Sequence, residues 1–356
     1  MKTPFFSVLI DSYNYGHYVE EAVSSVLAQD FPREEREILV IDDGSTDDTA
    51  ARLRRFGNAI RYLRKSNGGQ ASAFNYGFAQ ARGEVVALLD ADDVWFPEKF
   101  GRLYEAFERN PDAGMVYHRL YWWDGTKEDA ADRYFIPVSG HVPGSRRTLL
   151  KYPMASTSCL AFRRSALEKL LPMPEALRSQ ADAYLTALII FVAPVAAIGD
   201  YLGKYRLHGA NLFQTEGKQV SREHIENRMA MRAALLVEIE NWLKKNDQNI
   251  KSKNLRSYLA QWKKAQEQDR FLLEAPGRWK YFRHLFGFPW TYGEIMTGRH
   301  RVYSYLRASA ALVLGYHHLH LFDDARRKRK EWIASSSEKT VVAVKAKVKA
   351  AAATKS

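Results

Sequence analysis

Short apolar runs and helix-like stretches alternate along the first 110 residues. Each run predicts a buried strand, and each helix-like stretch carries apolar residues at spacings of three and four. Strands are predicted at residues 5–10, 38–41, 60–63 and 85–89, and helices at 18–29, from 47 onward, at 70–82 and at 96–109. Because four strands alternate with helices over this length, the pattern predicts a parallel, doubly wound α/β sheet.

Polar side chains follow these predicted strands. The first strand leads into Asp11-Ser12-Tyr13-Asn14, the second into residues 42–47, and Asn67 begins the Asn-Gly-Gly turn before the third helix. The carboxyl ends of parallel strands meet at one edge, where such sheets bind ligands. The chain has no GxGxxG after the first strand and no Walker-type glycine loop, so dinucleotide and P-loop sites lose support.

Three carboxylates follow the fourth predicted strand, in the sequence Asp90-Ala91-Asp92-Asp93. They cannot all stay ionised so close together without a counter-charge, so we expect a divalent cation with oxygen ligands, Mg²⁺ or Mn²⁺. The alternative is an acidic turn that caps the helix beginning near Pro97.

The middle of the chain is less regular. A strand is predicted at 115–121 and a variable loop at 122–140. Residues 183–199 are uncharged, which raises the question of a membrane span. Pro194 interrupts this stretch and acidic residues flank it, so a buried helix followed by a strand is favoured.

The C-terminal third is predicted to be helical. Apolar residues at spacings of three and four indicate one helix through Ile225 and Leu243 and a second through Leu255 and Trp262. Residues 278–292 hold seven aromatic residues among basic ones, which fits peripheral contact with a membrane interface; burial against the preceding helices is the alternative. The tail at 333–356 is predicted to be disordered.

Charge and cysteine content limit the function classes. The net charge is +12, but from Arg326 onward ten Lys or Arg face two Glu, which leaves only +4 for the rest. The basic character belongs mostly to the tail, so specific nucleic-acid binding is not expected. Cys159 is the only cysteine and the N-terminus does not resemble a signal peptide, so we expect a cytoplasmic protein, with peripheral attachment at the inner membrane face as an option.

The ordered set of motifs resembles the nucleotide-sugar-dependent family 2 glycosyltransferases of the GT-A fold. The resemblance covers about residues 5–210 and rests on the segments SVLIDSYNYGHYVEEAVSSVLAQ, ILVIDDGSTDDTA, NGGQASAFNYGFAQARGEVVALLDADD and YRLHG. It implies a GT-A, Rossmann-like, mostly parallel sheet with helices on both faces. It further implies that a sugar moves from a nucleotide donor, expected to be a UDP-sugar, to a hydroxyl of a glycan or lipid-linked acceptor.

The resemblance assigns the donor-binding residues position by position. Asp43 would contact the uracil, Asp11 and Tyr13 would line the base pocket, and Asp90 would lie near the ribose, with Ala91 at the centre of the DXD-type motif. Lys65, Asn67 and Asn75 complete the expected donor-binding set. The family often has an arginine where Phe74 stands, so one positive charge near the phosphates is missing here. Either Lys65 or Arg64 would supply that charge instead. Tyr13 packing on a helix and Asp43 serving only the turn remain alternatives.

The metal and the catalytic base are also implied by the resemblance. Asp92, with Asp93, would hold the metal, and His208 would complete its shell or touch the diphosphate, unless it is a structural histidine. Asp182 matches the family's catalytic base, although Ala181 replaces the acidic residue that usually precedes it. Its position at a helix start predicts a low pKa. The alternative roles are an N-cap for Asp182 and, for the whole chain, a nucleotide-sugar-binding protein on an inactive scaffold.

These expectations divide the chain into three parts. Residues 1–215 are predicted to form the catalytic domain, 216–332 a helical region and 333–356 the tail.

Overall fold

The computed structural model describes residues 3–130, 139, 155–208, 211, 221–248, 252–274, 279, 282–283, 285–286 and 302–314. Residues 1–273 form one compact unit, and residues 274–356 form a second. The predicted tail at 333–356 and most of the predicted interfacial segment at 278–292 lie outside the described residues.

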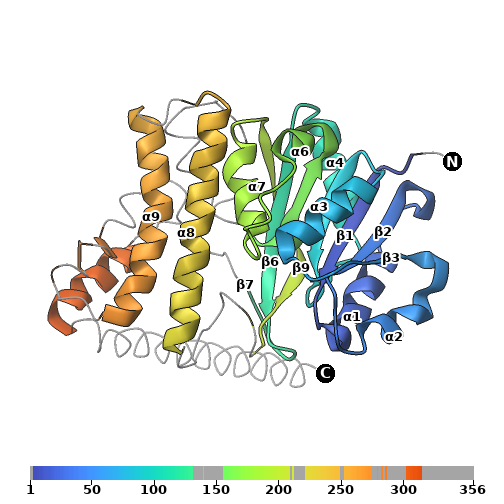
Figure 1. Cartoon of the computed structure of the whole chain (residues 1–356), viewed down its shortest axis with the longest axis horizontal. Coiled ribbons are helices and arrows are strands. Elements are labelled where there is room, and N and C mark those ends of the chain that lie inside the picture. Colours follow the sequence, from blue (N-terminus) through green and yellow to red (C-terminus); the bar gives the residue numbers. More distant parts are fainter. Residues whose placement is uncertain are drawn as a thin grey trace, which may run out of the picture. The chain divides into compact units, whose positions relative to one another are not determined.

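The described strands of the first unit form one mixed sheet (Figure 1). Their order is β3-β2-β1-β4-β8-β6-β9-β5, with β7 paired to β6. Strands β3, β2, β1 and β4 are mutually parallel, whereas β8 runs antiparallel to both β4 and β6. The strands are β1 Phe6–Ser12, β2 Arg36–Asp42, β3 Arg61–Arg64, β4 Val85–Asp90, β5 Val94–Trp95, β6 Met115–Trp123, β7 Glu128–Ala130, β8 Leu160–Arg163 and β9 Val195–Arg206.

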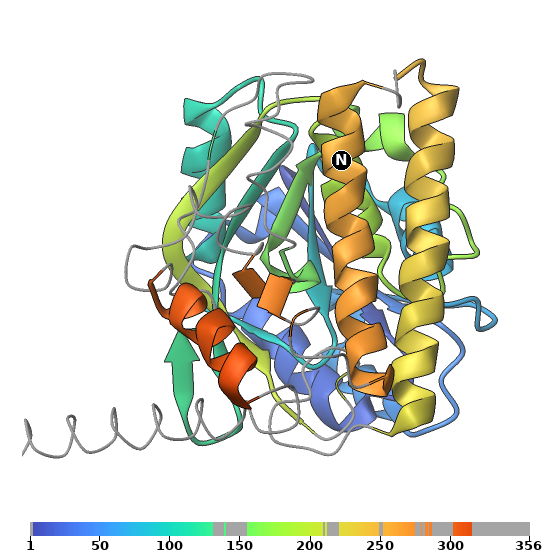
Figure 2. The same ribbon diagram turned by 90° about the vertical axis from the view of Figure 1, so that its left-hand side faces the viewer.

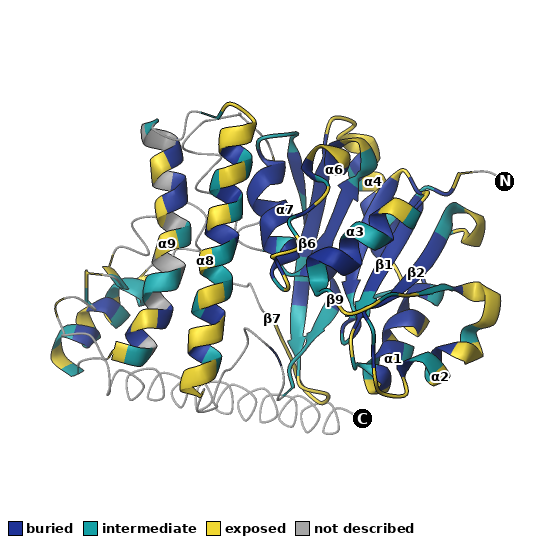
Figure 3. Ribbon diagram, in the orientation of Figure 1, coloured by how far each residue is buried: buried dark blue, intermediate teal, exposed yellow. Residues whose placement is uncertain are grey.

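Helices cover both faces of this sheet, which confirms the predicted α/β class. One core joins the sheet to α3, α6, α7, α8 and α9, and the other joins it to α1, α2 and α4. Both cores are shown by the dark strands between the helices in Figure 3. The helices are α1 Gly16–Leu27, α2 Thr49–Leu53, α3 Gln70–Gln80, α4 Lys99–Arg109, α6 Arg164–Leu167, α7 Ala181–Ile189, α8 Arg222–Lys245 and α9 Lys253–Glu274.

The predicted strands and helices appear where the apolar runs placed them. The runs in β1, β2 and β4 are buried along almost their whole length, whereas β3 is only partly buried. The uncharged stretch after Asp182 is the predicted buried helix followed by a strand, α7 and then β9. Within the described part of the chain, no helix has the length and apolar content needed to cross a bilayer. Strands β5 and β7 were not predicted, because each has at most three residues and β7 is polar.

Helices α8 and α9 lie side by side next to α7 (Figure 2). The Tyr258 hydroxyl donates to the Ala187 carbonyl at 2.7 Å. Between the two helices, Asp269 forms ion pairs of 2.6 Å with both Arg228 and Arg232. These helices share the core of the sheet and belong to the first compact unit, which ends at residue 273. The domain boundary expected at residue 215 stays a prediction.

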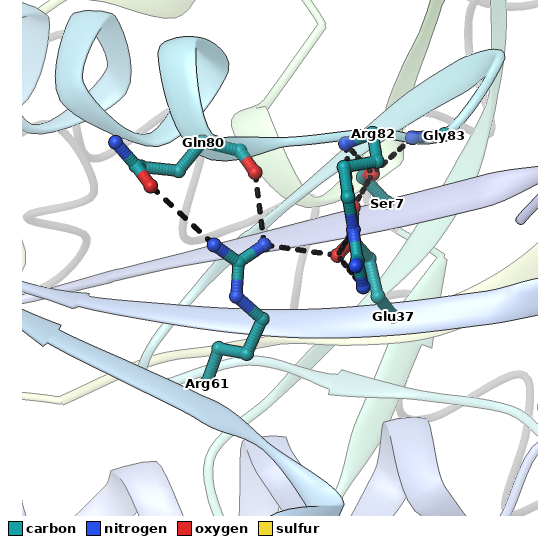
Figure 4. Close-up of polar contacts among 6 residues, drawn as sticks. All are labelled: Ser7, Glu37, Arg61, Gln80, Arg82 and Gly83. Carbon is teal, nitrogen blue, oxygen red and sulfur yellow. Dashed lines mark hydrogen bonds and ion pairs between the residues drawn. The ribbon is translucent and has the colours of Figure 1, made fainter. Parts of the chain in front are cut away.

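A buried carboxylate at the start of β1 and β2 ties together three segments of the sheet (Figure 4). Glu37 accepts a hydrogen bond from Ser7 at 2.6 Å, from Arg61 at 3.0 Å and from the Arg82 Nε at 2.9 Å. Ser7 in turn accepts the Gly83 N–H at 2.7 Å. Burial acts to raise the pKa of Glu37, but these hydrogen bonds outweigh it and hold the pKa below its usual value. The network secures the end of the sheet opposite the strand ends that carry the predicted site.

In the second unit, residues 302–314 are helical. Aromatic rings contact one another there: Trp279 stacks on Phe282, Phe282 contacts Phe286, and Phe286 contacts Tyr305, with ring centroids 5.0–5.3 Å apart.

Candidate active site

A cavity of about 690 Å³ opens at the carboxyl ends of β1 and β4. In the register of the sheet, Asp11 pairs with Asp90 on one side of β1 and Ser12 pairs with Asp42 on the other. The cavity therefore lies at the edge that the polar loops predicted. Eight of the predicted site residues line it: Asp11, Tyr13, Asp43, Asn67, Asp90, Ala91, Asp92 and Asp182.

The loops after β1 and β2 are locked to each other. Asn14 adopts a positive φ of 59°, and its backbone N–H donates to Ser45 Oγ at 2.9 Å. Its side-chain oxygen accepts the Thr46 N–H at 2.7 Å. Asn is one of the residues that tolerate this conformation. The loop presents Tyr13 on the cavity wall with 46% of its side chain exposed, so its ring is available to a flat ligand.

Asp43 holds the loop that precedes α3. Its carboxylate accepts hydrogen bonds from Lys65 Nζ at 2.8 Å, from the Gly68 N–H at 3.0 Å and from the Gly69 N–H at 2.7 Å. The carboxylate thus shapes this wall of the cavity, which it also lines. Lys65 neutralises Asp43 and is not among the residues that line the cavity.

The first turn of α3 is joined to the loop before α7 and to the first residue of α7. The N–H groups of Gln70 and Ala71 donate to the carbonyls of Arg178 and Leu177 at 2.9 and 3.2 Å. The Gln70 side-chain oxygen accepts the N–H of Ala181 at 3.0 Å. Each helix therefore satisfies N–H groups that have no partner within a helix. The contact is close enough that a Cβ on Gly69, whose φ is +87°, would lie 2.5 Å from the Cα of Arg178.

Asp90, Asp92 and Asp93 gather ligand atoms within 4.8 Å of one another. The pKa values of Asp90 and Asp93 are raised well above the usual range. Burial is the largest cause, and repulsion from the neighbouring carboxylates is the next. Burial also raises the pKa of the adjacent, half-buried Asp11 to about 7. A group of oxygen donors with this excess of negative charge, of which Asp93 is buried and Asp90 and Asp92 are half-buried, fits a hard divalent cation such as Mg²⁺ or Mn²⁺.

The end of β9 fixes the acidic group from the other side. Arg206 donates its backbone N–H to Asp93 at 2.9 Å and its Nε–H to the Asp92 carbonyl at 2.8 Å. Two residues later, His208 Nε2 lies 2.9 Å from Asp92 Oδ2. Asn211 Nδ2 donates to the Arg206 carbonyl at 3.0 Å and lies 3.3 Å from the His208 ring nitrogen. The structure thus brings His208 to the predicted metal ligand.

Asp182 lies in the first turn of α7 and lines the same cavity. Gln180 is the N-cap, so Asp182 is not. The Asp182 carboxylate accepts the Ala183 N–H at 2.7 Å and the Thr157 hydroxyl at 3.2 Å. The prediction of a low pKa is wrong: burial raises the pKa of Asp182, and the hydrogen bonds from Ala183 and Thr157 offset only part of this.

Asn75 is placed away from the predicted donor site. Its amide donates to the Met173 carbonyl at 2.8 Å and its side-chain oxygen accepts the Met173 N–H at 2.8 Å. It lines a second cavity with Phe78 and Arg164. Sequence reasoning could not show this, because Met173 lies 98 positions away.

Sequence reasoning also missed residues that line the cavity from distant segments. Arg178 and Gln180 come from the loop before α7, and Arg232 comes from α8. Thr157 is another such residue, and the structure places it against Asp182. The place of Arg232 among the apolar residues on the buried face of α8, which Arg228 shares, was the one available signal for it.

The comparisons with known proteins bear on the family and the fold. The sequence profile described as "Glycosyl transferase family 2" matches residues 7–171. An uncharacterized glycosyltransferase of Nostoc sp. is 36% identical over 234 residues, which cover 62% of this chain and 70% of that protein. Another from Rickettsia typhi is 28% identical over 61% of this chain and 69% of the relative.

A solved structure shows the same architecture. The crystal structure of S. aureus TarS 1–349 in complex with UDP-GlcNAc has a TM-score of 0.58 with 19% sequence identity, over 87% of this chain and 92% of the other. This likeness supports the predicted GT-A fold. From the sequence profile and the Nostoc relative together, we conclude that the chain belongs to the family 2 glycosyltransferases.

Proposed function

We propose that this glycosyltransferase is metal-dependent and moves a sugar, with inversion, from a UDP-sugar to a hydroxyl of a glycan or lipid-linked acceptor. The observation that carries the proposal is the presence, around one cavity, of the acidic group at 90–93 and of Asp182. The two would serve opposite sides of the sugar carbon. A hexose is the expected sugar, and the acceptor would enter from the side of Asp182.

Asp92 and Asp93 would hold the cation, and His208 would either join them or orient Asp92 through its hydrogen bond. A bound Mg²⁺ or Mn²⁺ would neutralise the growing charge of the diphosphate leaving group as a Lewis acid. Arg206 keeps Asp92 and Asp93 in place through the two hydrogen bonds to their loop. Preorganised ligands of this kind do not have to move as charge develops.

The donor's base would stack against Tyr13, and Asp11 would lie at the floor of the same pocket. Asp90 would be near the ribose, as its place beside Asp11 in the sheet supports. Asp43 would act by shaping the wall as well as by contacting the base, because three hydrogen bonds from residues 65–69 already hold its carboxylate.

Asp182 would take the proton of the attacking hydroxyl. Its raised pKa supports this role, because a carboxylate with a higher pKa is a stronger base at neutral pH. One base suffices for a single displacement with inversion. A retaining double displacement would need a second, nucleophilic group close to the sugar carbon.

The test uses the full chain with a panel of UDP- and GDP-sugars, with MnCl₂ or with EDTA. Thermal shift detects donor binding, because a ligand of the folded state raises Tm by mass action. Release of the free nucleotide measures turnover. Metal-dependent hydrolysis of a UDP-sugar is the expected result, and turnover that EDTA leaves unchanged would contradict the metal role. Binding without hydrolysis or transfer would instead favour a nucleotide-sugar-binding protein on an inactive scaffold.

Membrane contact through residues 278–292 is a second, independent part of the proposal. The described rings of this segment include Trp279 and Phe286, whose side chains are 63% and 41% exposed. Exposed rings among basic residues suit the interface of an anionic membrane.

A further inference from the structure

A short buried turn lies between the acidic group and Asp182. It is the 3-10 turn Thr157–Cys159, which leads directly into β8. Because β8 pairs antiparallel with β4, with Ala161 opposite Ala87, the turn lies beside the end of β4 where the acidic group begins. Thr157 is 2% exposed and Ser158 is fully buried.

Ser158 holds the acidic group in place. Its hydroxyl accepts the Asp90 N–H at 3.0 Å. Its own carbonyl accepts the Trp95 Nε1–H at 2.9 Å and the Lys99 Nζ–H at 2.8 Å. Lys99 is fully buried, with its Nζ 3.3 Å from the centre of the Trp95 ring. Ser158 is thus fixed on one side by two buried donors and holds the acidic group on the other.

Thr157 holds Asp182 in the same way. Its hydroxyl donates to Asp182 Oδ2 at 3.2 Å, and its backbone N–H also favours the ionised carboxylate. The titratable groups that interact with Asp182 from the other packed elements are Asp11 of β1, Asp90 of β4 and Tyr205 of β9. Arg232 of α8 lines the same cavity. Among these groups, the neutral Thr157 hydroxyl is a hydrogen-bond donor to the Asp182 side chain.

We propose that Thr157 and Ser158 act as one positioning element that sets the geometry between the metal-binding carboxylates and the general base. The inference rests on the proposed function, because it assigns these two residues to support the metal ligands and Asp182. Adjacent residues of one rigid turn hold the two halves of the site, so neither half can shift alone. Supporting hydrogen bonds of this kind typically affect metal affinity or activity by 10- to 100-fold.

Two variants one position apart separate the two roles. In Ser158→Ala the Asp90 N–H loses its acceptor, so the affinity of the full chain for Mn²⁺ in the presence of UDP should fall by about 10-fold or more, as measured by calorimetry. The matched control is Ser7→Ala, which removes another fully buried serine at the opposite end of the sheet. It should lower Tm and leave Mn²⁺ affinity unchanged.

Thr157→Val keeps the shape of the side chain and removes the hydroxyl. Losing a donor to the carboxylate should move the acidic limb of the kcat profile for UDP-sugar hydrolysis to higher pH, by roughly half to one unit. Mn²⁺ affinity should not change. Thr157→Ser should restore the wild-type profile, which a purely structural role of the methyl group would not explain.

The outcomes distinguish the two levels of the proposal. If EDTA leaves the rate of wild-type hydrolysis unchanged, or if Asp182→Asn retains a normal kcat, the proposed function fails and this inference fails with it. If the wild type behaves as proposed but Ser158→Ala keeps wild-type Mn²⁺ affinity, or Thr157→Val leaves the pH profile in place, the inference alone is overturned. If Ser158→Ala does not fold, Ser158→Gly and Ser158→Cys take its place. Whichever of these variants folds should show the same weakened affinity for Mn²⁺.

Discussion

The imidazole of His208 is hydrogen-bonded to the carboxylate of Asp92 across 116 positions of sequence, with Nε2 2.9 Å from Oδ2. The histidine follows the end of β9, and the aspartate follows β4, so the contact joins the two halves of the mixed sheet. Tyr18 of α1 stacks on the histidine ring, with 5.2 Å between centroids. The ring is therefore held in one orientation toward the carboxylate.

The first prediction concerns this pair. His208→Ala should weaken Mn²⁺ binding by about 10- to 100-fold, whether the ring is a ligand or orients Asp92. Asp92→Asn should abolish metal-dependent nucleotide binding, because the amide lacks the charge. Calorimetric titration of each variant with MnCl₂ and UDP gives the affinities. His17→Ala, on an exposed position of α1, is the control and should bind Mn²⁺ as the wild type does. Wild-type affinity in both site variants would place the metal elsewhere.

The second prediction concerns Asp182. Asp182→Asn preserves size and should lower kcat by about two to four orders of magnitude, as expected for the loss of a general base, with donor affinity unchanged. Burial raises the folded-state pKa of this carboxyl, so its ionised form destabilises the fold at pH values above its unfolded pKa. Tm at pH 7 should therefore not fall in the variant. Near-normal kcat, or a product of retained anomeric configuration, would remove Asp182 from the mechanism.

The third prediction follows from the buried Glu37. Its folded-state pKa is lower than the usual 4.5, so its stabilising effect is complete above pH 4.5 and is lost as the pH falls through the folded pKa. Glu37→Gln should lower the free energy of unfolding at pH 7 by about 1 to 3 kcal/mol, the cost of leaving buried polar partners unsatisfied. Denaturant titrations should show that the difference from wild type shrinks below about pH 4.

The control for this experiment is Glu84→Gln, which removes an exposed ion pair with Arg163. Exposed pairs contribute about 0 to 1 kcal/mol, so this variant should stay close to wild type at every pH. A Glu37→Gln deficit that persists unchanged in acid would show that the effect comes from packing and not from charge.

The fourth prediction concerns residues 278–292. The full chain should sediment with liposomes that contain anionic lipid at low salt, and less with zwitterionic ones. Replacing the exposed Trp279 and Phe286 by Ser should release it. Val237→Ser, which removes a 54% exposed apolar side chain from α8, is the control and should sediment normally. Failure of the intact chain to sediment at low salt would favour the buried alternative.

Local patterns predicted the fold class and the acidic part of the site. The strands that end at Ser12, Asp42 and Asp90 are contiguous apolar runs, and parallel topology alone brings their ends together. Such features need no knowledge of distant residues.

Contacts between distant segments could not be predicted in the same way. The packing of elements far apart in sequence determines the hydrogen bonds of Arg206 to the acidic loop and of Met173 to Asn75. It also determines the position of Arg232 on the cavity wall. The pKa of Asp182 was misjudged for the same reason, because the helix start is visible in the sequence whereas the burial that outweighs it is not.

The hydrogen bonds that join the first turn of α3 to the loop before α7 and to Ala181 have a consequence for how the cavity opens. Gln70 and Ala71 donate to the carbonyls of Arg178 and Leu177 in the loop before α7, and Ala181 donates to the Gln70 side chain. Fraying of the first turn of α3 therefore releases both this loop and the N–H of Ala181. The amide protons of Gln70, Ala71 and Ala181 should exchange with solvent through one shared opening event. A ligand that contacts both α3 and the start of α7 would slow the exchange of these amide protons together. Their exchange rates would then show whether the cavity is occupied.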